Sequence, residues 1–131
     1  MKMKPHIHLL ATGGTIAGQA SSHTATTGYR AGALSVEDLV NGVPGIREAA
    51  EITGETISAI DSKDMTEEIW LALSRRINEL ETEGETDGIV VIHGTDTMEE
   101  TAYFLELTTG HRIPVVLTGA MRPATALSAD G

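Results

Sequence analysis

The chain has 131 residues, carries nine basic and nineteen acidic side chains for a formal net charge of −10, and contains no cysteine. This length is enough for one domain with a sizeable core. The charge argues against nucleic acid or an anionic membrane as a partner, and the lack of cysteine excludes disulfides and thiolate metal sites. No apolar run approaches the length of about 18 residues that a membrane span requires.

The first predicted element is a short buried strand over residues 6–11, which ends at Gly13 and Gly14 and is followed at once by Thr15. Glycines at a strand end let the backbone turn sharply and leave N–H groups unshielded. A hydroxyl placed there suits a nucleophile beside an oxyanion-binding pocket. The alternative is an ordinary strand-to-helix turn in which Thr15 caps a helix.

A loop is predicted over residues 18–33, which are rich in Ser, Thr, Ala and Gly and show no apolar periodicity. A long segment of this kind in a compact domain is usually functional or disordered, so we expect it to be mobile. Tyr29 lies in it between Gly28 and Arg30. It is either the chemical group of a lid or a ring that only anchors the loop, and the sequence leaves both open.

Helices and strands alternate along the remaining chain. Ser35 is predicted to cap the first helix, and two capping boxes, Asp64 with Glu67 and Thr97 with Glu100, are predicted to begin later ones. Trp70 is expected to pack in the core. The predicted helices are 35–40, 47–51 (one turn), 64–83 and 97–107, the predicted strands are 52–60, 88–92 and 113–117, and residues 124–131 are expected to begin a further element.

This alternation predicts an α/β fold with a mainly parallel, doubly wound sheet and helices on both faces. Ligands of such sheets bind beyond the carboxyl ends of the strands. Four predicted strands end in hydroxyl, acidic or small groups, at residues 12–15, 61–64, 93–96 and 118–122. We therefore expect a polar pocket formed by Thr15, Tyr29, Ser62, Thr95 and Asp96.

Neither a metal nor a cofactor is expected. His6 and His8 are predicted to flank the first strand without forming a cluster, and His93 is more often a satisfied structural residue than a base, although histidine can serve as either. The Gly-x-Ser-x-Gly elbow of a Ser-His-Asp hydrolase is absent. Nucleophilic catalysis by threonine remains as the favoured chemistry.

Two long segments carry a resemblance to a known family. Residues 11–18, ATGGTIAG, and 92–102, IHGTDTMEETA, are similar to the two signature motifs of the bacterial-type L-asparaginase/glutaminase family, in its type II-like form. Residues 114–123 and 128–131 resemble further segments of the family in the same order. The match runs from about His6 to the last residue.

The resemblance implies hydrolysis of L-asparagine, and possibly of L-glutamine, to the acid and ammonia through an acyl-enzyme. Thr15 matches the primary nucleophile, Tyr29 the lid tyrosine that helps to activate it, and Thr95 the second catalytic threonine. Ser62 matches the residue that holds the substrate α-carboxylate, and Asp96 matches the acid that binds the α-ammonium. The predicted site residues are Thr15, Tyr29, Thr95 and Asp96 for catalysis, and Thr15, Ser62, Lys63, Thr95, Asp96, Gly14 and Gly94 for binding the small-molecule substrate.

Two departures from the family pattern affect these expectations. Lys63 stands where well-known extracytoplasmic members carry Gln or Glu, which leaves the preference for asparagine over glutamine open. The catalytic lysine of the family matches none of Lys2, Lys4 and Lys63. Residues 1–131 are accordingly expected to be the truncated N-terminal domain of a two-domain enzyme, with the C-terminal domain absent.

Further expectations follow for the whole protein. The full-length protein is expected to be a homo-oligomer, a dimer of dimers, and the 131-residue chain alone is expected to be inactive. A cytoplasmic location is expected because no leader is visible, and a periplasmic one if a signal peptide was removed or replaced. The alternative function is a non-catalytic domain that binds or senses an amino acid.

Overall fold

The computed structural model of the protein describes residues 3–25 and 27–131. Its helices and strands alternate as the sequence predicts, and most boundaries agree within two residues. In chain order the elements are β1 (His6–Gly13), η1 (Thr15–Ala17), α1 (Val36–Asn41), α2 (Ile46–Ala49), β2 (Glu51–Ile60), η2 (Ser62–Asp64), α3 (Glu67–Glu83), β3 (Gly88–Ile92), α4 (Met98–Thr108) and β4 (Val115–Thr118).

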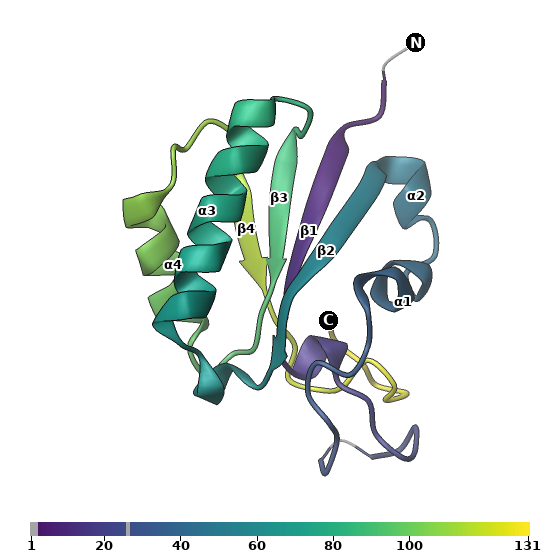
Figure 1. Cartoon of the computed structure of the whole chain (residues 1–131). Helices are drawn as coiled ribbons and strands as arrows, with labels where there is room; N and C mark the ends of the chain where they lie inside the picture. The colour runs from purple at the N-terminus through teal and green to yellow at the C-terminus, as the bar shows by residue number, and fades with distance from the viewer. Residues whose placement is uncertain (1–2, 26) are drawn as a thin grey trace.

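The four strands form one parallel sheet in the order β2-β1-β3-β4 (Figure 1). β1 therefore lies between its successor β2 and the later strand β3, and the direction of winding reverses at this point. Because ligands of open α/β sheets bind outside the strand ends at such a reversal, the corners that follow β1 and β3 are the first place to look for a site.

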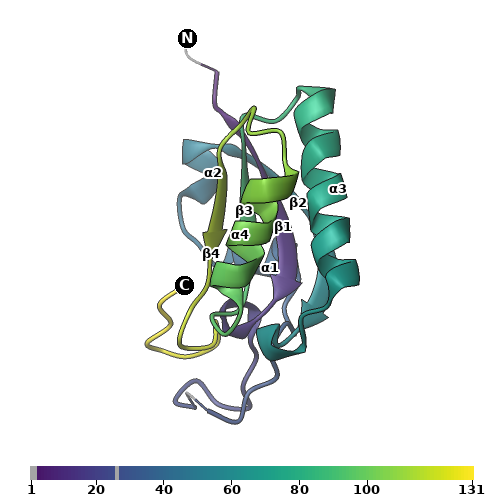
Figure 2. The same cartoon turned by 90° about the vertical axis from the view of Figure 1, so that its left-hand side faces the viewer.

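Helices cover both faces of the sheet, which confirms the doubly wound prediction. α3 and α4 lie on one face and α1 and α2 on the other (Figure 2). Adjacent residues of β1 point to opposite faces, so Leu10 packs with Leu73, Ile77 and Leu105 from α3 and α4. Its neighbour Leu9 packs instead in the second core cluster, which contains Val36 and Val40 of α1.

The first turns of the helices depart from the sequence prediction at two places. Ser35 caps α1 as expected, in a capping box with Asp38. Asp64 does not cap α3, because it ends the short turn η2, and Thr66 caps the helix by accepting a hydrogen bond from the N–H of Ile69. Thr97 occupies the cap position of α4, but its side chain makes no capping bond, so the predicted capping box there is also wrong.

His6 and His8 share hydrogen-bond partners in a polar network, and among the described residues they belong to no group that could hold a metal ion. They are two residues apart on β1 and therefore face the same side of the sheet. His6 Nε2 and His8 Nδ1 each lie 2.7 Å from Oγ1 of Thr53 on β2. His8 Nε2 also lies 2.9 Å from Oε1 of Glu55, which Arg76 of α3 binds as well. A polar network thus joins β1, β2 and α3 near the start of the strands.

The sequence predicts that a further element begins in the segment after β4, but the structure has neither a helix nor a strand there. Residues 124–128 form turns and residues 129–131 have no regular structure, and the N–H of Arg122 donates to Oδ1 of Asp130 at 2.9 Å. This segment lies beside the loop that follows β1 (Figure 1), since the N–H of Leu127 donates to the carbonyl of His23 at 2.8 Å. Among the described residues, no helix is long and apolar enough to cross a membrane.

Candidate functional site

The corners after β1 and β3 are in direct contact at their glycines. Gly13 and Gly14 have positive φ angles of 116° and 79°, a conformation that side chains rarely adopt. A Cβ atom on Gly14 would lie only 2.5 Å from the backbone nitrogen of Gly94. Thr12 reinforces the contact, because its Oγ1 donates to the carbonyl of Ile92 at 2.9 Å. The two motifs of the sequence therefore meet at one point of the fold.

An irregularity in β2 directs its end across the end of β1. Ala11 pairs with Thr56, but Gly13 pairs with Ile60, so β2 has extra residues at this point. A bulge of this kind bends the strand and changes the direction of the residues that follow. The hydroxyl of Ser58 donates to the carbonyl of Thr12 at 2.9 Å. After the bulge, η2 lies against the corner of β3, although β2 and β3 are not neighbours in the sheet.

Thr15 and Tyr29 are hydrogen-bonded to each other. Their hydroxyl oxygens lie 2.6 Å apart, and both residues are half-buried. Thr15 does not cap a helix, because the cap position of η1 is Gly14 and no side chain bonds there. The loop that carries Tyr29 is held by an antiparallel bridge between Gln19 and Arg30. The structure thus places the tyrosine against the predicted nucleophile.

Ser62 and Asp96 form a second group beside the glycine contact. Ser62 is 2% exposed, and its Oγ accepts a hydrogen bond from the N–H of Asp96 at 3.0 Å. A Cβ atom on Gly94 would lie 2.5 Å from the same Oγ. The side chains of Thr95 and Asp96 are exposed. A carboxylate that is open to solvent beside a buried hydroxyl could bind an ammonium group and a carboxylate on one small ligand.

His93 has the surroundings of a structural residue. It is fully buried, with Nδ1 2.6 Å from the carbonyl of Gly94 and Nε2 2.8 Å from Oγ1 of Thr101. Burial lowers the pKa of His93 below its ordinary value, because the charged ring would lose its hydration, although the Gly94 carbonyl and Glu100 act in the opposite direction. Within the described residues, no group of three or more histidine or acidic side chains is arranged to hold a metal.

A cavity of about 670 Å³ opens beside Tyr29. Arg30 and Lys63 bring positive charge to its wall, and Asp61 and Asp64 bring negative charge. Lys63 is exposed and lies on the Tyr29 side of the site. The predicted residues therefore fall into two groups, Thr15 with Tyr29 and Ser62 with Asp96, which the contact between the glycines joins.

Sequence reasoning missed three residues that build this geometry, namely Thr12, Ser58 and Thr97. Thr12 lies within the first motif, but a buried hydroxyl that ties two strands together has no local signal. Ser58 contributes only because β2 is irregular, and irregularities of strands are not visible in periodicity. Thr97 lies directly before α4, where the local pattern predicts a cap, so its hydrogen bond to the distant Ser62 has no local signal.

Comparison with known proteins agrees with these features. Residues 6–131 match the family model described as Asparaginase, N-terminal. The chain is 53% identical to L-asparaginase 2 of Bacillus subtilis and 52% identical to L-asparaginase 2 of Escherichia coli, in each case over 97% of this chain. It covers 34% and 36% of those proteins, so the chain spans about a third of the length of the curated relatives that it matches.

A solved structure shows the same arrangement. The crystal structure of a probable cytoplasmic L-asparaginase from Campylobacter jejuni matches with a TM-score of 0.93 and 56% sequence identity, over 98% of this chain and 39% of that one. The family model matches nearly the whole chain, and the solved structure has the same fold. Together these two findings determine the family. The chain belongs to the asparaginase family and corresponds to its N-terminal region.

Proposed function

We propose that the protein is an amidohydrolase that converts L-asparagine to L-aspartate and ammonia, with Thr15 as the nucleophile. The observation that supports this most directly is the 2.6 Å hydrogen bond between Thr15 Oγ1 and the Tyr29 hydroxyl, in a chain that belongs to the asparaginase family. A threonine hydroxyl is a weak nucleophile unless a neighbour takes up its proton. Tyr29 is the group placed to do so.

The chemical step has two halves. Thr15 Oγ1 attacks the carbonyl carbon of the side-chain amide, and its proton passes by way of the Tyr29 hydroxyl to the departing nitrogen, so that the C–N bond breaks and ammonia leaves. Water then attacks the resulting ester, one of its protons passes by way of the Tyr29 hydroxyl to Thr15 Oγ1, and the bond from carbon to Thr15 Oγ1 breaks to release aspartate and restore the threonine hydroxyl. The balance is one amide and one water for one acid and one ammonia.

The negative oxygen that forms in each half needs hydrogen-bond donors. We assign this role to backbone N–H groups of the Gly14–Thr15 and Gly94–Thr95 corners, which meet at their glycines. The loss of one such donor typically costs roughly 2.7–4 kcal/mol of transition-state stabilisation. Thr95 is proposed as the second catalytic threonine, which acts from the exposed corner after β3.

The two charged ends of the amino acid have separate partners in this proposal. Asp96 binds the ammonium group, and the Ser62 hydroxyl, whose oxygen already accepts from the Asp96 N–H, donates its own proton to the α-carboxylate. Lys63 adds a positive charge at the wall of the neighbouring cavity. Its contact with a substrate carboxylate, and its effect on the choice between asparagine and glutamine, are part of the proposal.

The experiment that tests the mechanism is ammonia release by the full-length protein that contains this chain, compared with Thr15→Ala and Thr95→Ala. We expect each variant to lose about 10³-fold or more in kcat, as is usual when a member of an acyl-transfer centre is removed. Rates close to those of the unmodified protein in both variants would end the claim. Binding of aspartate without any turnover in the unmodified protein would favour the amino-acid-binding alternative.

Activity of the whole protein is proposed to need residues that this chain does not carry. Lys63 lies at the site, but Lys4 donates to the carbonyl of Arg47 near the opposite end of the strands. Neither corresponds to the lysine that the family resemblance implies beside Thr95. We therefore predict that the 131-residue chain alone releases no measurable ammonia from L-asparagine, whereas the full-length protein does. Turnover by the purified chain, confirmed by its intact mass, would refute this.

We propose a homo-oligomer, a dimer of dimers, for the full-length protein, which its mass in solution tests. The cytoplasm is the proposed compartment, and cell fractionation tests it. The proposed compartment is supported by the description of the Campylobacter jejuni relative as a probable cytoplasmic L-asparaginase.

A further inference from the structure

Thr97 occupies the position of a helix cap but does not cap its helix. The side chains of Ser35 and Thr66 accept hydrogen bonds from the first turns of α1 and α3. At the start of α4, by contrast, Thr97 has φ −129° and ψ 19°, and its side chain makes no such bond. A threonine here ordinarily stabilises the helix by capping it, so its hydroxyl must be used elsewhere.

The hydroxyl of Thr97 is used to hold Ser62. Thr97 Oγ1 donates to the carbonyl of Ser62 at 2.8 Å, across 35 positions of sequence. The preceding residue makes a second bond to the same serine, because the N–H of Asp96 donates to Ser62 Oγ at 3.0 Å. Both polar ends of Ser62 are therefore bound by two consecutive residues of the corner after β3. We call this pair of bonds the Ser62 clamp.

The surroundings of the clamp leave Ser62 little freedom to adopt another position. Ser62 is 2% exposed, so water has little access to the two bonds. On the side toward β3, its Oγ lies only 2.5 Å from where a Cβ atom of Gly94 would be. The Ser62 carbonyl also accepts the N–H of Met65 at 3.2 Å, which fixes it within its own turn η2. The two bonds of the clamp are those that tie Ser62 to the corner after β3, and so to Asp96.

We propose that Thr97 is a positioning residue that sets the spacing between Ser62 and Asp96. The consequence for catalysis rests on the proposed function, in which these two residues bind the carboxylate and the ammonium of one amino acid. Both groups are attached to the same carbon of the substrate, so their partners must be held at a matching separation. The hydroxyl that would otherwise cap α4 supplies this restraint.

Thr97→Val tests the proposal, because it removes the hydroxyl and keeps the shape of the side chain. In the full-length protein we expect KM for L-asparagine to rise about tenfold, the equivalent of one hydrogen bond, with kcat within about twofold of the unmodified value. Thr97→Ser keeps a hydroxyl and should restore KM. Thr66→Val is the matched control, because the Thr66 hydroxyl bonds to Glu68 and Ile69 in the first turn of α3, so it should lower stability and leave KM unchanged.

Amide hydrogen exchange gives a readout that does not depend on activity. In Thr97→Val the N–H of Asp96 should exchange about tenfold faster, because the Ser62 carbonyl is then bound only within η2 by the N–H of Met65 and no longer to the corner after β3. In Thr66→Val the exchange should not change. Unchanged exchange at Asp96, or a KM that Thr97→Ser fails to restore, overturns the proposal. If exchange changes as expected but the unmodified protein has no amidase activity, the proposed function fails and the clamp stands.

Discussion

Gly14 and Gly94 allow two backbone segments to come closer than any side chain would permit. Gly14→Ala would require a left-handed φ of 79° and would place Cβ 2.5 Å from the nitrogen of Gly94. Gly84 has a similar φ of 71° with nothing within 4 Å of the added Cβ. The ψ angles differ, because Gly84 (ψ 15°) is in the left-handed helical region whereas Gly14 (ψ −177°) is in a region that is essentially restricted to glycine. Gly14 therefore combines a stricter conformation with crowding.

We predict that Gly84→Ala lowers the free energy of unfolding by about 1 kcal/mol, since a left-handed conformation costs an L-residue roughly 1–2 kcal/mol. Gly14→Ala should lower it by at least about 1 kcal/mol more, because its backbone conformation is essentially restricted to glycine and the corner after β3 must move as well. Urea denaturation of the two variants measures the difference. Equal losses would show that the glycine corners do not constrain each other.

His93 contributes a pH dependence to stability. A neutral His93 ring satisfies both of its nitrogens. Nδ1–H donates to the Gly94 carbonyl, and Nε2 accepts from the Thr101 hydroxyl, whose oxygen in turn accepts from Trp70 Nε1–H. Burial lowers the pKa of His93 below the ordinary value of 6.5. The unfolded chain therefore binds a proton at this residue at a higher pH than the folded chain does.

It follows that the stability contributed by His93 is complete above about pH 7 and decreases as the pH falls through the ordinary pKa toward the lowered one. His93→Gln should be less stable than the unmodified protein at pH 7.5, and the gap in unfolding free energy should narrow toward about pH 5. Chemical denaturation of both proteins across this range measures the gap. A gap that stays constant would mean that the pKa of His93 is not lowered.

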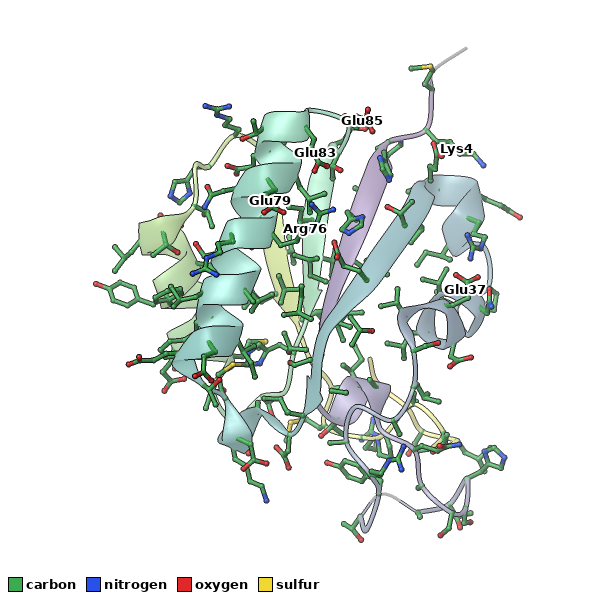
Figure 3. The ribbon with its side chains drawn as sticks, in the orientation of Figure 1. Lys4, Glu37, Arg76, Glu79, Glu83 and Glu85 are labelled. Carbon is green, nitrogen blue, oxygen red and sulfur yellow. The ribbon has the colours of Figure 1, made fainter. Side chains whose placement is uncertain are left out.

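At the scale of elements, α3 is joined to β2 through Arg76 and Glu55. Arg76 Nε binds Oε1 of Glu55 at 2.5 Å, and its NH1 group reaches Glu79 and Glu83 on the same helix. Figure 3 shows these three residues of the helix along one side of α3. Partial burial acts to raise the pKa of Glu55, but hydrogen bonds from Arg76 and His8 outweigh it, and the pKa is lowered.

Because the pKa of Glu55 is lowered on folding, its contribution to stability is present above the ordinary value of 4.5 and is lost as the pH falls through the folded pKa. Glu55→Gln should therefore be less stable than the unmodified protein by about 1 kcal/mol at pH 7, and this difference in unfolding free energy should decrease as the pH falls below 4.5. Glu79→Gln is the control, because Glu79 is more exposed and binds Arg76 alone. A difference for Glu55→Gln that persists at low pH would contradict this.

The order of elements could be predicted from the sequence because it depends on local periodicity, and the residues of the two long motifs could be identified by resemblance. The contacts that build the site could not. Thr97 has the sequence context of a cap, and only the position of Ser62, which is distant in the chain, shows where its hydroxyl goes. His6 and His8 could not be recognised as neighbours through Thr53 before the register of β1 on β2 was known.

At the scale of the whole molecule, nineteen acidic side chains against nine basic ones leave the surface with unbalanced negative charge. Like charges repel one another in the compact state, and about 0.1 M salt screens them beyond roughly 10 Å. We predict that the melting temperature of the chain rises when sodium chloride is increased from about 0.01 M to 0.2 M. A fall over this range would mean that ion pairs such as that of Arg76 outweigh the repulsion.

The central place of β1 also has a kinetic consequence. Residues that pair between β1 and β2 are about 45 positions apart in the sequence. The hydrogen bond from Thr12 to Ile92, which joins β1 to β3, connects residues that are 80 positions apart. Pairings that close long stretches of chain form slowly. During refolding, a species that contains only β1, α1 and β2 would hold Thr15, the proposed nucleophile, without the corner after β3. Capacity to bind a ligand should consequently return later than the earliest protected amides, at the moment when β3 docks.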